Sequence, residues 1–258
     1  MTRKDDEVRL AHDDVNDFCK PYIEETRQYK TLHFEPSEFQ SRMSKHDPTR
    51  LVIDYTRTMM GFLQLNPRPE RIGIIGLGGG SLAKFCFREL PQARIDVAEI
   101  NPHVLALRDE FLVPADGARF EVHLEDGAAF VERSPRRFDV LLLDAYTRQG
   151  MPARLASLEF YDRCREALDE DGVLVANLFC ATDALQLDRI DQVFGGNTFS
   201  LREEDETNRV VFACNGDLLR RRRFVRPDLS SQLSVSAWAQ LKPAFLRIAA
   251  AMRTPLRG

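Results

Sequence analysis

Residues 72–85, IGIIGLGGGSLAKF, give the clearest indication of the fold. A short apolar run leads into four glycines, Gly76, Gly78, Gly79 and Gly80, and then into a helical pattern. A glycine-rich turn between a strand and a helix lets a ligand approach the backbone closely. The helix that follows adds unpaired N–H groups and the positive end of its dipole. Because the third glycine of the dinucleotide fingerprint GxGxxG would fall at Ser81, a merely tight turn is the alternative interpretation.

The composition is that of a globular chain of 258 residues, 43% hydrophobic and 29% charged. That length can bury the core of one large domain with an accessory part. The net charge of −4 argues against general nucleic-acid binding, and no apolar run approaches the roughly 18 residues of a membrane span. The charged N-terminus lacks the apolar segment of a secretory signal, so we expect a cytoplasmic protein without nucleic-acid or membrane partners. The five cysteines and five histidines are scattered, which predicts free thiols and no metal site.

From residue 71 onward the pattern alternates between strands and helices. Strands are expected at 71–75, 93–100, 118–124, 138–145 and 172–179, and helices at 81–90, 102–111, 128–133, 157–168 and 183–194. The segments 197–202 and 208–215 are expected to form a closing antiparallel pair. Repeated β-α-β units predict an α/β fold with a Rossmann-like, doubly wound, mostly parallel sheet.

The ends of the chain have a different pattern. Short segments between residues 21 and 54 have strand character and precede a short helix at 55–65, so we expect a small β-rich N-terminal element. This divides the chain into residues 1–67 and a nucleoside-binding domain at 68–258. A C-terminal helix at 235–252 carries an apolar stripe that is expected to pack on the protein's own sheet rather than on a partner, made of Trp238, Leu241, Phe245 and Ile248. The four arginines at 220–223 are interpreted as a solvated helix end or a clamp onto an acidic surface.

Acidic residues follow three of the expected strands. Glu99 stands about 20 residues beyond the glycine turn, where an acid can bind both hydroxyls of a ribose. Asp126, followed by Gly127, stands after the third strand and could accept a hydrogen bond from an adenine amino group. Asp144 ends the fourth strand, at the edge of the sheet where ligands of such folds bind. Each acid alone is more often a cap or a solvated residue, but together with the turn they predict a nucleoside ligand.

The turn also limits which nucleoside is expected. A dinucleotide would favour the regular fingerprint, whereas a short glycine turn without a pyrophosphate suits S-adenosylmethionine or its decarboxylated form.

The chain resembles the spermidine synthase (polyamine aminopropyltransferase) family, a branch of the class I S-adenosylmethionine-dependent methyltransferase fold. The resemblance runs from about residue 55 to 179 through IIGLGGGSL, VAEINPHV, HLEDGAAFV, FDVLLLDAY and LASLEFYDRCREALDEDGVLVANL. It implies that Glu99 binds ribose, that Asp126 contacts adenine and that Asp144 is the base facing an acceptor amine. It also implies a small-molecule amine or polyamine-like acceptor and a homodimer.

The chain departs from the family where the polyamine would bind. Gly79 stands where the family has an aspartate, and Thr147 followed by Arg148 stands where the family's loop has its second acid. Ahead of the sheet, Tyr55-Thr56-Arg57 replaces a motif that ends in glutamate. Losing such acids from a buried site costs on the order of several kcal/mol of binding to a polycation. The residues expected to face the acceptor are therefore Tyr55, Arg57, Tyr146, Thr147 and Arg148.

Three functions remain open from the sequence. Aminopropyl transfer to an amine follows from the resemblance. Methyl transfer from S-adenosylmethionine is the alternative, because Gly79 removes a charge that would repel the donor's carboxylate and leaves backbone N–H groups that suit it. A nucleoside-binding or interaction protein without catalysis is the third.

Overall fold

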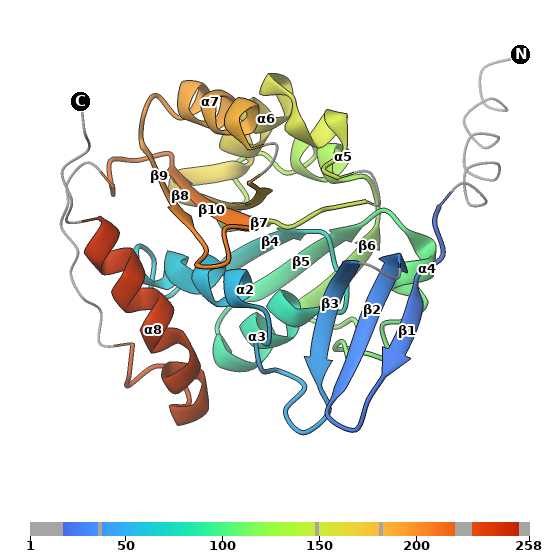
Figure 1. Cartoon of the computed structure of the whole chain (residues 1–258). Coiled ribbons are helices and arrows are strands. Elements are labelled where there is room, and N and C mark those ends of the chain that lie inside the picture. The colour runs from blue at the N-terminus through green and yellow to red at the C-terminus, as the bar shows by residue number, and fades with distance from the viewer. Residues whose placement is uncertain (1–17, 36–37, 148–149, 181–182, 220–228, 253–258) are drawn as a thin grey trace, which may run out of the picture.

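The protein contains a large central sheet with helices on both faces and a small separate sheet at its N-terminal side (Figure 1). The computed structural model describes residues 18–35, 38–147, 150–180, 183–219 and 229–252. The arginines at 220–223 lie outside these residues.

The central sheet has seven strands in the order β6-β5-β4-β7-β8-β10-β9. Their bounds are β4 (Arg71–Ile75), β5 (Arg94–Glu99), β6 (Phe120–Leu124), β7 (Phe138–Leu143), β8 (Leu168–Phe179), β9 (Thr198–Arg202) and β10 (Asn208–Cys214). The strands from β6 to β8 run parallel, and β10 is antiparallel to both β8 and β9. The predicted doubly wound sheet with a closing antiparallel pair is confirmed.

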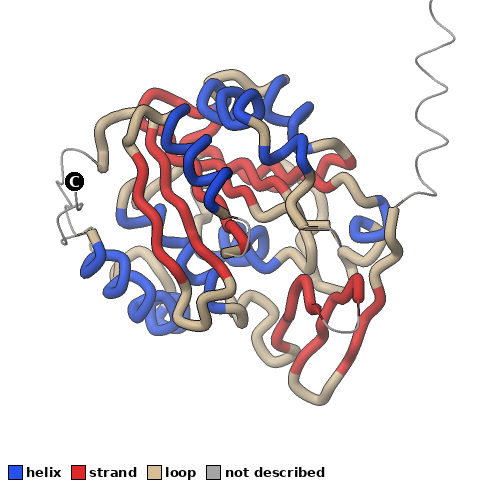
Figure 2. Tube along the Cα trace, turned by 45° about the horizontal axis from the view of Figure 1, so that its top comes forward, coloured by secondary structure: helices blue, strands red, loops and turns tan. Residues whose placement is uncertain are grey.

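Helices cover the two faces of this sheet (Figures 1 and 2). One face carries α2 (Asp54–Met59), the 3-10 helix η2 (Met60–Gln64), α3 (Ser81–Glu89), α4 (Pro102–Leu105) and α8 (Val235–Ala251). The other carries α5 (Gly127–Glu132), η3 (Ala153–Ala156), α6 (Leu158–Ala167) and α7 (Ala184–Val193). None of the helices described is long and apolar enough to span a bilayer.

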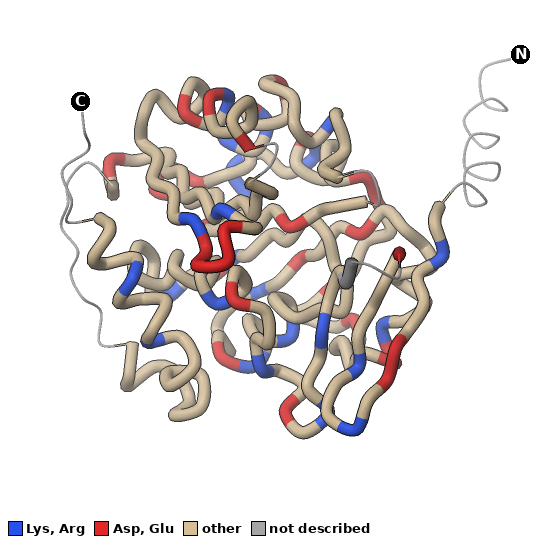
Figure 3. The backbone as a smooth tube through the Cα atoms, in the orientation of Figure 1, with Lys and Arg blue, Asp and Glu red and all other residues tan. Residues whose placement is uncertain are grey.

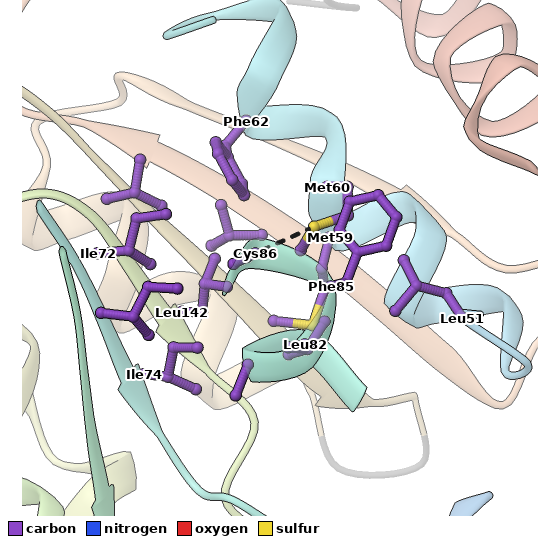
Figure 4. Close-up of a cluster of buried hydrophobic side chains, with 14 of the residues drawn as sticks. Leu51, Met59, Met60, Phe62, Ile72, Ile74, Leu82, Phe85, Cys86 and Leu142 are labelled. Carbon is purple, nitrogen blue, oxygen red and sulfur yellow. Dashed lines mark hydrogen bonds between the residues drawn. The ribbon is translucent and has the colours of Figure 1, made fainter. Parts of the chain in front are cut away.

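The apolar run of β7 is buried because both of its faces carry helices. Val140 and Leu142 point into the core on the α3 side, whereas Leu141 and Leu143 point into the core on the α6 side. Figure 4 shows the first of these cores, where Leu142 lies with side chains of β4 and α3. This two-sided burial is the expected signature of a parallel sheet strand.

The small sheet is an antiparallel meander of β1 (Tyr22–Glu25), β2 (Tyr29–Glu35) and β3 (Glu38–Ser44). A strand predicted near residues 50–54 is absent, because α2 begins at Asp54. The helix predicted at 102–111 is wrong beyond Leu105, where backbone hydrogen bonds shorten from i−4 to i−3 at Leu107 and Arg108. The division at residues 67 and 68 stays a prediction.

The C-terminal helix α8 packs on the protein itself, as its stripe predicts. Leu241, Phe245 and Ile248 are buried in the core, and Trp238 packs against it. At the contact with η2, a Cβ at Gly61 would lie 2.4 Å from Ile248 Cδ1 and 2.8 Å from the Phe212 ring, so a larger residue there would force these side chains to move. All five cysteines are free thiols.

Candidate functional site

The glycine turn meets the end of β7 where the strand order of the sheet reverses. The Asp144 backbone N–H donates to the carbonyl of Ile75 at 2.9 Å. Gly76 has a φ of 95°, and a Cβ there would overlap the Asp144 carbonyl. Only glycine adopts this positive φ readily and also leaves room for the Asp144 carbonyl. Since ligands of open α/β sheets bind at this reversal, Gly76 and Asp144 lie at the expected binding edge.

Glu99 ends β5 with its carboxylate beside the turn. Its Oε2 accepts from the backbone N–H of Leu77 at 2.9 Å, and its Oε1 accepts from that of Asn101 at 2.8 Å. Burial raises the pKa of this carboxyl group, and the backbone hydrogen bonds oppose the rise. The side chain is therefore fixed at the turn, and its contact with a ribose stays a prediction.

Asp126 caps α5. Its Oδ1 accepts from the N–H groups of Ala128 and Ala129 at 3.0 and 3.2 Å, and Arg154 lies 3.3 Å from the same oxygen. A side chain at Gly127 would overlap Ile75 of β4, so this glycine is required for packing. The contact of Asp126 with adenine stays a prediction.

Asp144 is held by two side chains from other parts of the fold. The Tyr55 hydroxyl donates to Oδ2 at 3.1 Å, and the Asn177 amide donates to Oδ1 at 2.9 Å. Burial raises the pKa of Asp144, and these two hydrogen bonds oppose the rise. Burial and the nearby carboxylate raise the pKa of Tyr55 well above its ordinary value, so Tyr55 remains a donor. The arrangement is that of a desolvated, oriented base.

Asn177 was missed by the sequence analysis, although it interrupts the apolar run GVLVANLF of β8. It is buried and also accepts from the Asn208 amide at 3.0 Å. Tyr146 donates to the Asn177 backbone carbonyl at 2.8 Å. Two of the five residues expected to face the acceptor, Tyr55 and Tyr146, are thus brought together around Asp144.

The other three residues expected there have different surroundings. Thr147 is exposed, and its hydroxyl donates to the Gly150 carbonyl at 3.0 Å within its own loop. Arg57 pairs with Asp54 and donates to the Leu51 carbonyl at 3.4 Å. Arg148 lies outside the described residues. Their roles at the acceptor stay predictions.

Gly79 does not adopt a left-handed conformation, but it is crowded. A Cβ there would lie 2.7 Å from Ser41 Oγ and 2.9 Å from a ring carbon of Phe111. Ser41, from β3, lies 3.4 Å from the hydroxyl of Ser81. Two hydroxyls therefore border the position where the family has its acid. Ser41 could not be found from the sequence, because the approach of β3 is set by tertiary packing.

One group of potential metal ligands occurs among the described residues. Asp96, Glu121 and His123 have ligand atoms within 4.8 Å of one another. Arg94 pairs with both acids, at 3.2 and 2.8 Å, and Arg137 lies 3.2 Å from Asp96. These arginines already balance the acids. The expectation of no metal site stays a prediction.

Comparison with known sequences shows the family. The fold is that of the class I methyltransferases, and residues 53–189 match the family model described as "Spermine/spermidine synthase domain". A polyamine aminopropyltransferase of Chromobacterium violaceum is 36% identical over 194 residues, which cover 74% of each chain. The chain belongs to the spermine/spermidine synthase family and is a transferase.

Other relatives and solved structures include methyltransferases. The eEF1A lysine and N-terminal methyltransferase homolog of Drosophila melanogaster is 30% identical over 156 residues, which cover 56% of this chain and 23% of that one. A probable spermidine synthase from Corynebacterium glutamicum superposes with a TM-score of 0.66, covering 76% of each chain at 18% identity. Human methyltransferase-like protein 13, solved in complex with SAH, superposes with a TM-score of 0.59, covering 80% of this chain and 95% of that one at 24% identity.

Proposed function

We propose that the protein transfers an aminopropyl group from decarboxylated S-adenosylmethionine to an amine acceptor. The observation that carries this proposal is the Asp144 carboxylate, which is held by Tyr55 and Asn177 beside the glycine turn. The 36% identity to a named polyamine aminopropyltransferase supports the choice of reaction.

The chemistry requires a base. An amine is protonated near neutral pH and becomes a nucleophile only when it loses that proton. The free amine then attacks the methylene carbon next to the sulfonium; a C–N bond forms, and the C–S bond breaks with its electron pair moving to sulfur. Asp144 accepts the proton, and its raised pKa favours this role. Each of its oxygens accepts one hydrogen bond from Tyr55 or Asn177 and retains acceptor capacity for the substrate.

The residues around the turn fit an S-adenosyl donor. In the proposed complex Gly76, Gly78, Gly79 and Gly80 hold the aliphatic end through backbone N–H groups. Glu99 binds the ribose and Asp126 contacts adenine. The SAH bound in the structure of human methyltransferase-like protein 13 supports a ligand of this class. A cytoplasmic location and a homodimer remain predictions from the sequence.

Methyl transfer from S-adenosylmethionine is the second candidate. It is favoured by position 79, where a glycine stands in place of the family's aspartate and the hydroxyls of Ser41 and Ser81 lie close by. The Drosophila methyltransferase relative supports it as well. A nucleoside-binding or interaction protein without catalysis is the third candidate.

Calorimetry with each donor tests the proposal. Aminopropyl transfer predicts tighter binding of decarboxylated S-adenosylmethionine than of the full molecule. A preference for the full donor favours methyl transfer. If neither donor binds, the proposal is wrong and the third candidate remains.

A further inference from the structure

Asp126 uses only one of its two carboxylate oxygens within the protein. Its Oδ1 accepts from the backbone N–H groups of Ala128 and Ala129 at 3.0 and 3.2 Å and so caps α5. Its Oδ2 accepts no hydrogen bond from any described residue. The Asp126 side chain is 26% exposed. The cap therefore leaves one acceptor oxygen for a ligand at the edge of the sheet.

Arg154 of η3 lies beside the same carboxylate. Its Nη1 is 3.3 Å from Asp126 Oδ1, and its side chain is 64% exposed. Within the described part of the chain, its guanidinium has no other ion pair or hydrogen bond. A guanidinium carries several N–H donors in a planar fork, so most of them remain available to a ligand. Arg154 and Asp126 thus place a hydrogen-bond donor and an acceptor side by side.

The backbone that carries Arg154 is fixed next to Asp126. Leu155 is 5% exposed and lies 3.4 Å from where a Cβ at Gly127 of α5 would be. The Ser157 hydroxyl donates to the Arg154 carbonyl at 3.0 Å. Packing and hydrogen bonding therefore hold η3 against the start of α5, although the guanidinium itself is exposed.

Adenine carries the complementary pattern of hydrogen-bonding groups. Its amino group donates, and the ring nitrogens N1 and N7 on either side of that group accept. The amide of an Asn or Gln side chain reads adenine in nucleic acids in this way, with one acceptor and one donor. A carboxylate with a neighbouring guanidinium offers the same two functions.

We infer that Arg154 is a specificity-determining residue for the nucleoside, which donates to N1 or N7 of adenine while Asp126 Oδ2 accepts from the amino group. The inference rests on the proposed function, in which the adenine of the donor lies at Asp126. It assigns to Arg154 a contact with the base that the sequence analysis did not anticipate.

The structural alternative is an ion pair that only joins η3 to α5. Exposed pairs usually contribute little to stability, and Figure 3 shows charged residues of both signs spread along the chain. The two interpretations differ in one measurable respect. A structural pair changes the affinity for every nucleoside alike, whereas a residue that reads adenine changes the relative affinity for nucleosides that differ only in the base.

Calorimetry with methylthioadenosine and its 1-deaza and 7-deaza analogues tests the inference. Each analogue replaces one ring nitrogen by a C–H group and keeps the amino group. The wild type should bind one analogue about fivefold or more weakly than methylthioadenosine, because a hydrogen bond from a charged donor is lost. Arg154→Met should bind that analogue and methylthioadenosine equally. Arg163→Met is the matched control, since Arg163 pairs with Glu166 of its own helix at 2.8 Å; it should keep the wild-type preference.

Two results would overturn the inference. One is equal affinity of the wild type for all three nucleosides. The other is a preference in Arg154→Met that matches the wild-type preference for each analogue. A thermal melt checks that the variant folds, and if it does not melt cooperatively, Arg154→Lys replaces it. Because the shorter lysine cannot offer the same planar fork, it should reduce the preference, and an unchanged preference would overturn the inference.

Binding and turnover together separate this inference from the proposed function. If the wild type binds none of the three nucleosides, both are wrong. If Arg154 sets the preference but no methylthioadenosine is released from the decarboxylated donor, the proposed reaction is wrong and the role of Arg154 stands. If the reaction proceeds and the preference does not depend on Arg154, the reaction stands and the role of Arg154 is wrong.

Discussion

The hydroxyl of Tyr55 donates to Asp144 Oδ2 at 3.1 Å, although the two residues are 89 positions apart. Tyr55 lies on α2, which packs against α8 and β10, whereas Asp144 follows β7. The proposed base is thus oriented by an element that precedes the large sheet. Catalysis should therefore depend on how α2 is packed.

Replacing Tyr55 by phenylalanine should shift the pH dependence of the reaction. The Tyr55 hydrogen bond lowers the pKa of Asp144 against the effect of burial, so removing it should raise that pKa further. Because the carboxylate is the working form, the acidic limb of kcat/KM should move to higher pH, measured with one fixed amine. Tyr146→Phe is the control, since its hydroxyl bonds to the Asn177 carbonyl. A limb that stays in place or moves to lower pH in Tyr55→Phe would contradict this role.

Replacing Glu99 by glutamine should weaken nucleoside binding. Two hydrogen bonds from ribose to a charged acceptor are expected to be lost or weakened, at a cost of about 1.5–3 kcal/mol in the affinity for methylthioadenosine. Calorimetry measures this, and a thermal melt checks that the turn still folds, because Glu99 also accepts from Leu77 and Asn101. Glu121→Gln on the adjacent strand is the control. Unchanged affinity in a folded Glu99→Gln would remove the ribose assignment.

Placing the family's aspartate at position 79 should destabilise the protein. Its Cβ would lie 2.7 Å from Ser41 Oγ and 2.9 Å from Phe111, and such overpacking typically costs about 1–3 kcal/mol. Chemical denaturation should show this loss for Gly79→Asp and partial recovery when Ser41→Gly is added. Gly117→Asp is the control, because nothing lies within 4 Å of a Cβ at Gly117. Equal stability of the two aspartate variants would show that the turn adjusts freely.

Lys84 should make stability depend on pH. It is 3% exposed and donates to the Phe111 carbonyl at 2.7 Å, and burial lowers its pKa to about 7 from the ordinary 10.5. Between these values the unfolded chain keeps a proton that the folded chain has released, so the free energy of unfolding should rise with pH. From pH 7.5 to 8.5 the free energy of unfolding should rise by up to about 1 kcal/mol more in the wild type than in Lys84→Met. The control Lys242→Met, at an exposed position of α8, should keep the wild-type dependence of the free energy of unfolding on pH. The same dependence in Lys84→Met and wild type would contradict the lowered pKa of Lys84.

The fold could be predicted from the sequence because its signals are local. The glycine turn, the apolar runs of β4 and β7 and their spacing define β-α-β units without knowledge of the packing. The composition of residues 102–111 suits a helix, but the helix ends at Leu105. Tighter turns follow it, and the Phe111 carbonyl accepts a hydrogen bond from Lys84, which the local pattern could not predict.

The site was predictable only in part. Glu99, Asp126 and Asp144 follow strands, so the topology brings them to one edge of the sheet. Ser41 and Asn208 gave no signal, because their contacts depend on how β3 approaches the turn and how β10 pairs with β8.

The by-product of the reaction distinguishes aminopropyl transfer from methyl transfer. The protein is incubated with equal amounts of S-adenosylmethionine and its decarboxylated form, together with 1,4-diaminobutane, and the released nucleosides are separated by chromatography. Asp144→Asn is the parallel control, expected to react roughly 100-fold more slowly while binding nucleoside within a few-fold of wild type. Aminopropyl transfer predicts that methylthioadenosine accumulates and that S-adenosylhomocysteine does not. Accumulation of S-adenosylhomocysteine instead would contradict aminopropyl transfer, and methylthioadenosine formed equally fast by Asp144→Asn would contradict the role of Asp144 as the base.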